Sequence, residues 1–364
     1  MAESLRQRLK TRLALSGPMT VADYMSEALA NPRHGYYRHR DPLGTQGDFI
    51  TAPEISQVFG ELIGAWLAER WQALGSPEKV LLVELGPGRG TLMADALRAT
   101  RSIAGFHAAI DLHLVEINET LKQMQREAIG KYVAPHWHDG FASLPEDAPL
   151  LLVANEFFDA LPIRQLQRTT QDWRERLVSL QGETLRFALA PGPSPLSALL
   201  SLTLQANAGA IAEISLPARA LARDIGERIA RRRGAALIVD YGYASPRLGD
   251  SLQAVAQHKV ADPLAAPGEA DLSAHVDFAA LAQSAQSARA MSYGPTTQGE
   301  FLQALGIHQR LAALTQRADA TQAAVLEGGV QRLIAPRQMG TLFKVLALTD
   351  LQSPAPAGFA AIEE

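Results

Sequence analysis

A glycine-rich turn stands between an apolar run and a helical stretch near residue 86. Residues 79–85 are followed by Gly86, Gly88 and Gly90, and TLMADALRAT continues the chain with helical spacing. Glycine lets a backbone approach a ligand closely, and the first N–H groups of a helix have no partner within the helix. A strand, a glycine turn and a helix in this order are typical of the ligand-binding edge of a parallel α/β sheet. The sequence therefore predicts a ligand site at this turn.

Polar residues close four apolar runs along the chain. These runs end at Glu84, at Glu116, at Asn155-Glu156 and at Asp240. In an open parallel sheet the ligand lies beyond the carboxyl ends of the strands. These side chains are therefore expected to converge at that edge of the sheet, which we call the rim. A polar residue often follows an apolar run, but four such ends in series, one of them attached to a glycine turn, favour a shared site.

The spacing of the glycines separates two classes of nucleotide ligand. The nicotinamide fingerprint G-x-G-x-x-G requires a glycine where Thr91 stands, and its ribose-binding acid follows about 20 residues later. Here the next strand-end acid, Glu116, lies 116 − 86 = 30 residues after Gly86. Both departures disfavour a dehydrogenase. The pattern E-x-G-x-G-x-G from Glu84 to Gly90, with an acid after the next strand, resembles the core of class I S-adenosylmethionine-dependent methyltransferases.

This resemblance implies roles for the residues at the rim. In that family the glycine loop passes the methionine portion of the cofactor, the second acid binds the ribose hydroxyls and a later Asp contacts the adenine. A carboxylate suits a vicinal diol because it accepts two hydrogen bonds at once. Asn155 and Glu156 would form the floor beside the transferable methyl group. The cofactor-binding residues implied are Glu84, Gly86, Gly88, Gly90, Glu116, Asp139, Gly140 and Asn155.

Longer runs narrow the resemblance to one family. GDFITAPEISQVFGELIGAW at 47–66 and ANEFFDALPIR at 154–164 are similar to the MidA-like family of these methyltransferases, and the likeness extends over residues 17–348. That family includes the mitochondrial methyltransferase that assists assembly of respiratory complex I and dimethylates an arginine of a core subunit. The resemblance implies an S-adenosylmethionine-dependent enzyme that N-methylates an arginine of a protein substrate, with a complex I subunit as the candidate partner.

Carboxylates are the expected catalytic groups for this acceptor. An arginine side chain is protonated at ordinary pH, so a site must orient it, localise its charge and accept a proton. Glu156 and Asp159 are the first candidates, because the strand-end argument places them beside the methyl donor. Asp48 and Glu54 follow, in a loop suited to cover the site. The structural alternatives are a turn or cap for Asp159 and a first-turn helix position for Glu54.

The elements that must position these residues form one sheet with additions. We predict a Rossmann-like α/β class I methyltransferase sheet in a domain over 79–349, with strands completing it over 331–349. A helical segment over 1–78 precedes it as a lid, including a long helix over 54–73. Insertions at 163–233, extended and then helical, and at 243–330, with several helical patterns, are expected to form a substrate-recognition subdomain. Residues 350–364 are expected to be a flexible tail.

Composition excludes several further classes of function. Lys and Arg total 34 against 38 Asp and Glu, a net charge of −4, which disfavours a nucleic-acid partner. No run reaches the roughly 18 uninterrupted apolar residues of a membrane span, so no stable membrane insertion is expected. The chain has no cysteine, and His136 and His138 merely alternate in an extended segment, so no metal is expected.

The first residues bear on location. Leu5, Leu9 and Leu13 recur at four-residue spacing and Glu3 is acidic, which favours an amphipathic first helix over a transit peptide. On this interpretation the chain is a bacterial cytoplasmic member of the family, with the mitochondrial matrix as the alternative.

Other activities stay open at the level of sequence. One is an assembly factor that binds the cofactor with little catalysis, which labelled methyl transfer to a subunit would distinguish from an enzyme. Another is a small-molecule methyltransferase, which predicts a closed apolar pocket in place of an open groove. The oligomeric state is not predicted.

Overall fold

The computed structural model describes residues 4–39, 51–201, 204–256 and 259–360. The chain divides into two units. The sheet unit comprises Ile50–Phe158, Leu221–Ala244 and Phe278–Glu364, and the insertion unit comprises Met1–Phe49, Asp159–Ala220 and Ser245–Asp277. Asp48, a predicted catalytic candidate, lies outside the described residues. Within the ranges that are described, no helix has the length and apolar character needed to cross a membrane.

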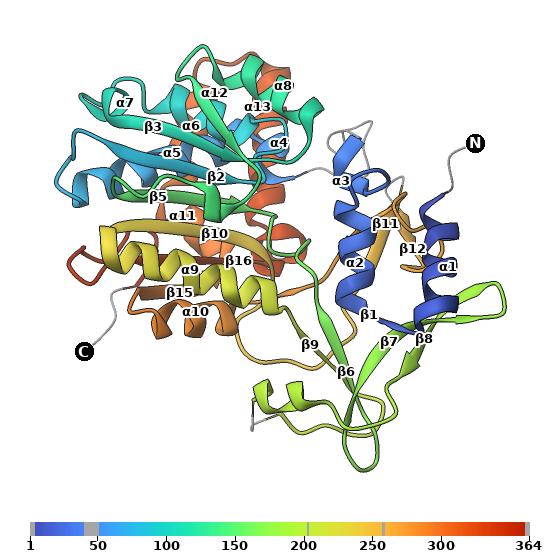
Figure 1. The fold of residues 1–364 in the computed structure, drawn as a ribbon. Helices are drawn as coiled ribbons and strands as arrows, with labels where there is room; N and C mark the ends of the chain where they lie inside the picture. Colours follow the sequence, from blue (N-terminus) through green and yellow to red (C-terminus); the bar gives the residue numbers. More distant parts are fainter. Residues whose placement is uncertain (1–3, 40–50, 202–203, 257–258, 361–364) are drawn as a thin grey trace. The chain divides into compact units, whose positions relative to one another are not determined.

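The sheet unit is built on a mostly parallel sheet with the strand order β15-β16-β10-β5-β2-β3-β4 (Figure 1). Its neighbours from β10 to β4 are parallel, whereas β16 pairs antiparallel with both β10 and β15. This is the Rossmann-like architecture that the sequence predicts. The strands are β2 (Val80–Leu85), β3 (Ile110–Val115), β4 (Pro135–His138), β5 (Leu150–Asn155), β10 (Gly234–Tyr243), β15 (Met291–Thr297) and β16 (Phe343–Thr349).

The central strands are apolar along nearly their whole length. Every residue of β2 and of β5 is buried, as expected for a parallel sheet covered on both faces. Leu82 pairs in register with Leu151, and the polar residues of these strands stand at their carboxyl ends, at Glu84 and Asn155. The sequences of β2 and β5 thus place polar side chains only at the rim.

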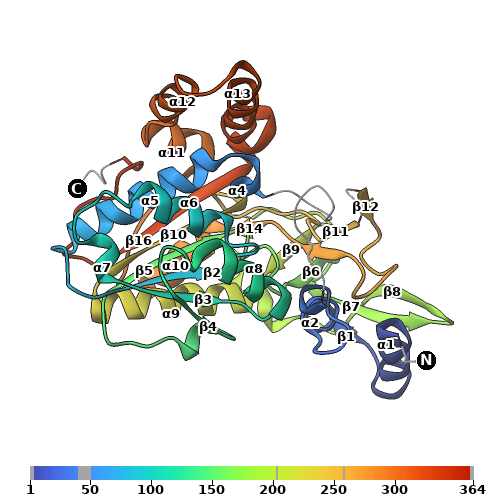
Figure 2. The ribbon, with the colours of Figure 1, turned by 90° about the horizontal axis from the view of Figure 1, so that it is seen from above.

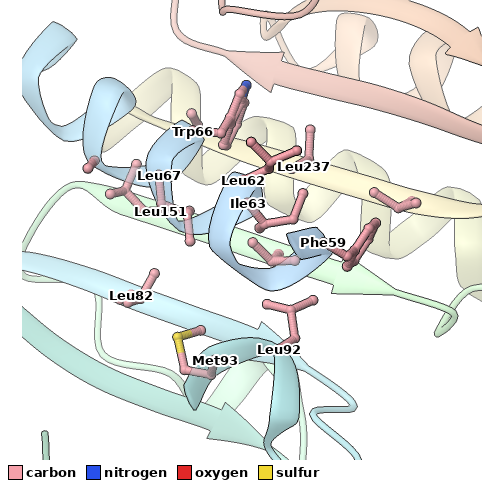
Figure 3. Packing of buried hydrophobic residues seen from close by; sticks show 14 of the residues in the cluster. Phe59, Leu62, Ile63, Trp66, Leu67, Leu82, Leu92, Met93, Leu151 and Leu237 are labelled. Carbon is pink, nitrogen blue, oxygen red and sulfur yellow. The ribbon is translucent and has the colours of Figure 1, made fainter. Parts of the chain in front are cut away.

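Helices cover both faces of this sheet. Figure 2 shows α5 (Gln57–Ala73) and α9 (Leu216–Arg232) on opposite faces. In Figure 3, Phe59 and Trp66 of α5 lie over Leu151 and Leu237 of the sheet. A side chain on Gly64 would come within 2.6 Å of Ala96 in α6, so this glycine permits close packing of the two helices. The remaining helices are α4 (Ala52–Ile55), α6 (Thr91–Ala99), α7 (Phe106–Ala109), α8 (Glu119–Ile129) and α10 (Phe278–Ser287).

Three further helices form a cluster beside α4 and α5: α11 (Gln298–Ala304), α12 (Ile307–Thr315) and α13 (Ala320–Ile334) (Figure 2). A buried carboxylate ties this cluster to the rest of the unit. Glu61 of α5 lies 2.5 Å from the Nε of Arg310 in α12 and 2.8 Å from an Nη of Arg98 in α6. Burying Glu61 alone would cost free energy, and two guanidinium partners offset that cost.

The insertion unit has its own small sheets and its own core. One sheet has the order β1-β7-β6-β9 with β8 on β7, and the other has the order β12-β11-β13. Leu5, Leu9 and Leu13 of α1 are buried in the core of this unit, which confirms the predicted first helix. The elements are α1 (Leu5–Ser16), β1 (Met19–Thr20), α2 (Val21–Ala30), α3 (Tyr36–His39), β6 (Arg164–Arg168), β7 (Trp173–Gln181), β8 (Thr184–Leu189), β9 (Ile211–Ile214), β11 (Gln253–Ala256), β12 (Lys259–Ala261), β13 (Asp271–Ser273) and β14 (Val276–Asp277).

Several predicted elements differ from the structure. The predicted helix over 54–73 is two helices, because Ser56 is extended and caps α5 by accepting from Val58 N. The predicted strands over 331–349 reduce to β16, since α13 and a π-helical turn at Pro336–Gly340 occupy the first part. Its partner β15 lies in a stretch predicted to be helical, where Gly294-Pro295 interrupts the alternation typical of a strand.

Candidate active site

The glycine turn after β2 has a backbone that favours glycine. Gly86, Gly88 and Gly90 have φ angles of 61°, 54° and 83°, in the left-handed region where other residues are strained. A side chain on Gly86 would also come within 2.8 Å of the ring of Phe157. The turn is fixed to the neighbouring strand because Gly86 N donates to Val115 O at 3.0 Å. It leads directly into α6, whose first N–H groups have no partner within the helix.

Two buried acceptors lie at this rim without donors. Oε2 of Glu84 and Oδ1 of Asn155 have no hydrogen-bond partner among the residues that the structure describes. Glu84 pairs in register with Val153, two residues before Asn155, so both side chains point to the same face of the sheet. Burial raises the pKa of Glu84 to about 8. Because an unpaired buried acceptor is costly, this pair is suited to receive donors from a ligand.

Glu116 follows β3 as a carboxylate with a fixed orientation. Its Oε1 accepts from Ile117 N and Asn118 N, each at 2.8 Å, and its Oε2 accepts from Gln125 Nε2 at 3.2 Å. Burial raises the pKa of Glu116 in spite of these hydrogen bonds. Gln125 was not predicted as a site residue. The available signal was its position on α8, where it takes a buried place in line with Leu121 and Ile129.

Asp139 and Gly140 follow β4, the next strand. Glu116 N donates to His138 O at 3.0 Å, so the ends of β3 and β4 are joined beside Asp139. The Asp139 carboxylate is largely exposed and lies 3.8 Å from the Nζ of Lys122. Its side chain is therefore free to turn toward a ligand at the rim.

The turn after β5 holds Glu156 in an unusual conformation. Its φ is 50°, which costs free energy for a residue other than glycine. Asp240, at the end of the neighbouring strand, stabilises the turn because its Oδ2 accepts from Phe157 N at 3.2 Å and from Phe158 N at 2.9 Å. The Glu156 Oε1 accepts from Ala52 N at 2.9 Å. Strain of this kind is stored mainly at functional sites.

Glu54 also contacts the rim. On α4 it accepts a hydrogen bond from the hydroxyl of Thr91, and its Oε2 lies 3.9 Å from an Nη of Arg89. Glu54 does occupy the first turn of a helix, which was the structural alternative. In addition, its side chain contacts Arg89 in the glycine turn and Thr91, the first residue of α6.

Asp159 belongs to the insertion unit, whereas Glu156 belongs to the sheet unit. Within its own unit, Asp159 O accepts from Ala274 N at 3.0 Å. The hydroxyl of Tyr37 donates to Asp271 there at 2.6 Å. Burial, followed by the charges of Asp271 and Asp159, raises the pKa of Tyr37 well above its ordinary value. Asp159 and Glu156 thus stand on either side of the boundary between the two units.

The histidines of β3 and β4 contact one another. His113 Nδ1 lies 2.9 Å from His138 Nε2, and burial lowers the pKa of both rings. In the part of the chain that is described, no group of His, Asp and Glu is arranged to hold a metal ion.

Comparisons with known proteins identify the family of this chain. The model of a family of S-adenosyl-L-methionine-dependent methyltransferases matches residues 62–296. The mouse mitochondrial protein arginine methyltransferase NDUFAF7 is 38% identical in an alignment 373 positions long, which covers 95% of this chain and 84% of the mouse protein. Its human counterpart is 37% identical in an alignment 374 positions long, which covers 95% of this chain and 83% of that protein.

Solved structures agree with these relatives. A crystal structure from Burkholderia thailandensis, bound to S-adenosyl-homocysteine, matches with a TM-score of 0.86 at 28% identity and covers 97% of this chain and 93% of that chain. A second structure from the same organism has a TM-score of 0.84 at 31% identity, with 98% and 94% covered. These matches confirm the class I methyltransferase fold.

One prediction is wrong. We expected a bacterial cytoplasmic location, but the mouse, human and zebrafish relatives are all named as mitochondrial proteins. That prediction relied on Glu3, which lies outside the described residues, and on the leucine spacing of Leu5–Ser16, which form α1 of the insertion unit. A helix that belongs to a folded core carries no information about the compartment.

The rim places a glycine turn, two buried acceptors that lack donors among the described residues, and an oriented carboxylate at the ends of three adjacent strands. The family model and the solved structure bound to S-adenosyl-homocysteine show that the cofactor of this family is S-adenosylmethionine. The chain therefore belongs to the MidA-like family of class I S-adenosylmethionine-dependent methyltransferases, and S-adenosylmethionine is its methyl donor.

Proposed function

We propose that this enzyme methylates an arginine side chain of a protein substrate. Relatives that are named protein arginine methyltransferases match 95% of the chain. The observation that carries the proposal is the fixed Glu156 carboxylate, held at a φ of 50° beside the buried acceptors of β2 and β5. A carboxylate is the group that orients a guanidinium and accepts its proton.

The same rim supplies the proposed cofactor contacts. Glu84 and Asn155 would accept from the ammonium group of the methionine portion, because their buried oxygens lack donors among the described residues. Glu116 would accept from the ribose hydroxyls. Asp139 and Gly140 would contact the adenine. Gly86, Gly88 and Gly90 would allow the backbone to approach the methionine portion.

Methyl transfer from a sulfonium is an in-line displacement. A C–N bond forms to the arginine nitrogen as the C–S bond breaks, S-adenosylhomocysteine leaves, and the nitrogen loses a proton. Glu156 would hold the guanidinium by hydrogen bonds to its N–H groups, point the attacking nitrogen at the methyl carbon, and take up the proton. Positioning of the reacting atoms at about 3–3.5 Å supplies most of the rate enhancement in such reactions.

Asp159 and Asp48 are proposed to assist this acceptor rather than to replace Glu156. Asp159 follows Glu156 by three positions along the chain and begins the second segment of the insertion unit. We further propose that the insertions, which form their own sheets and core, recognise the protein substrate. A complex I subunit is the candidate substrate, because the resemblance to the MidA-like family implies it.

Replacing Glu156 by Gln tests the catalytic proposal. The amide oxygen can still accept from Ala52 N, so the fold of the turn is retained, but an amide cannot take up the proton. Turnover with labelled S-adenosylmethionine and the candidate subunit should fall by about 10²–10⁴-fold, while S-adenosylhomocysteine binds as before. Glu119→Gln makes the same change at an exposed carboxylate and should leave turnover intact. Full turnover in Glu156→Gln would refute the assignment.

A further inference from the structure

Gln125 joins three parts of the cofactor rim from a position inside α8. Its side chain is fully buried. Its Nε2 donates to Gly88 O of the glycine turn at 2.7 Å and to Glu116 Oε2 at 3.2 Å. Its Oε1 accepts from Trp137 Nε1, on β4, at 2.8 Å. One amide thus connects the segments that follow β2 and β3 with the body of β4.

The chemistry of these partners fixes the direction of the amide. An indole N–H can only donate, so the oxygen of Gln125 must face Trp137. A backbone carbonyl and a carboxylate can only accept, so the NH₂ group must face Gly88 and Glu116. Without this donor, two acceptors would face each other in a buried place, which is unfavourable. No other orientation of the amide satisfies all three partners.

Backbone packing adds a second restraint at the same point. A side chain on Gly90 would come within 3.3 Å of the Cα of Gln125 and within 3.0 Å of Ile129. The helix that carries Gln125 therefore lies directly against the glycine turn. A small movement of α8 would shift the Gly88 carbonyl and the Glu116 carboxylate together.

We propose that Gln125 is a positioning residue for S-adenosylmethionine, which holds the glycine turn and the Glu116 carboxylate at one fixed separation. It sets the distance between the glycine turn, where the methionine portion would bind, and Glu116, where the ribose would bind. Gln125 itself would contact neither part of the cofactor. The inference deepens the proposed cofactor site, because it depends on the role given to Glu116. It does not depend on the identity of the methyl acceptor.

Gln125→Met tests this inference in the full-length protein. Methionine has a similar shape but neither donates nor accepts a strong hydrogen bond. The Kd for S-adenosylhomocysteine, measured by titration calorimetry, should rise by about tenfold or more, since one of the lost bonds is to a carboxylate. Gln298→Met is the matched control, because Gln298 is equally buried and donates to Leu333 O at 2.8 Å, outside the rim. It should lower the Tm but change this Kd by less than about twofold.

A double-mutant cycle with Glu116→Gln separates the proposed coupling from general destabilisation. If Gln125 acts through Glu116, the fold-increase in Kd of the double variant will be clearly smaller than the product of the fold-increases of the two single variants. The inference is overturned if the fold-increase in the double variant equals that product, or if the Kd of Gln125→Met is unchanged. An unchanged Kd in Glu116→Gln alone refutes the ribose assignment and the coupling together. None of these measurements includes an acceptor, so failure of the arginine proposal is seen separately.

Gln125→Glu gives a second variant, which keeps the shape of the side chain. Its ionised carboxylate would place an acceptor toward Gly88 O and Glu116, and affinity should fall further than in Gln125→Met. Protonation restores a donor, so the ratio of the variant Kd to the wild-type Kd should decrease as the pH is lowered. A ratio that does not change with pH would show a merely structural role and would overturn the inference.

Discussion

The Oε1 of Glu156 accepts the backbone N–H of Ala52 at 2.9 Å, which fixes the carboxylate after β5 to the first residue of α4. Two residues further along α4, Glu54 accepts a hydrogen bond from Thr91 at the start of α6. One short helix thus contacts both the proposed proton acceptor and the helix that follows the glycine turn. Any displacement of α4 would move these two parts of the rim together.

The hydrogen bonds that stabilise the turn of Glu156 can be tested by replacing their acceptor, Asp240. Asp240→Ala leaves Phe157 N and Phe158 N without their acceptor, at a cost of about 1–3 kcal/mol for each unsatisfied group. Both the Tm and the turnover should fall, because the turn can no longer hold Glu156 at a φ of 50°.

Asp350→Ala is the control for that variant. Asp350 is also buried and accepts from backbone N–H groups of Gly234 and Gln352, at the other end of β10. It should lower the Tm by a similar amount and leave kcat for the folded enzyme within about twofold. An equal loss of kcat in both variants would argue against a specific role for Asp240.

The buried carboxyl of Glu84 predicts a pH dependence of stability. Burial raises its pKa in the folded state from 4.5 to about 8. A raised pKa means that the folded state binds the proton more tightly, so the stability from this group is present below pH 4.5 and is lost as the pH rises through 8. Each unit of pKa shift corresponds to about 1.4 kcal/mol.

Glu84→Gln removes this titration. Without ligand, the Tm of the wild type should fall relative to that of Glu84→Gln between pH 5 and pH 8, in the range set by the two pKa values. Scanning calorimetry at several pH values measures this difference. A constant difference in Tm across the range would show that Glu84 does not titrate there.

The glycine turn predicts a difference between two Gly→Ala variants. Gly90 and Gly75 have similar φ angles, 83° and 90°, but only Gly90 has neighbours, Ile129 and Gln125, within 4 Å of an added Cβ. Gly75→Ala should therefore cost only the strain of the left-handed region, about 1–2 kcal/mol. Gly90→Ala should cost more and also weaken S-adenosylhomocysteine binding, as denaturant unfolding and titration calorimetry would show. Equal stability and unchanged binding in the two variants would contradict the close approach of α8.

The sequence predicts the strands that end at the rim better than it predicts the later elements, such as β15. Apolar runs that end in a polar residue are a local signal, and they locate the ends of β2, β3 and β5 to within one residue, whereas β10 continues past Asp240 to Tyr243. β15 was missed because its sequence, with Gly294-Pro295 in the middle, lacks the alternation of a strand. Its pairing with β16 depends on contacts about 50 residues apart.

Two site residues show the same limit. Gln125 shares a buried stripe with Leu121 and Ile129, but its three hydrogen bonds come from other strands and turns, which no local pattern reveals. Asp159 lies three positions after Glu156, yet it begins a segment of the insertion unit, and no local pattern reveals this boundary.

The central claim is that this enzyme methylates arginine in a protein. The most direct measurement is to incubate the wild type with methyl-labelled S-adenosylmethionine and a complex I preparation from cells that lack the enzyme, and then to analyse the hydrolysed protein fraction for labelled amino acids. We expect the label in N-methylated arginine, with Glu156→Gln giving at most about a hundredth of it. Label in another amino acid, or only in small molecules, would contradict the claim.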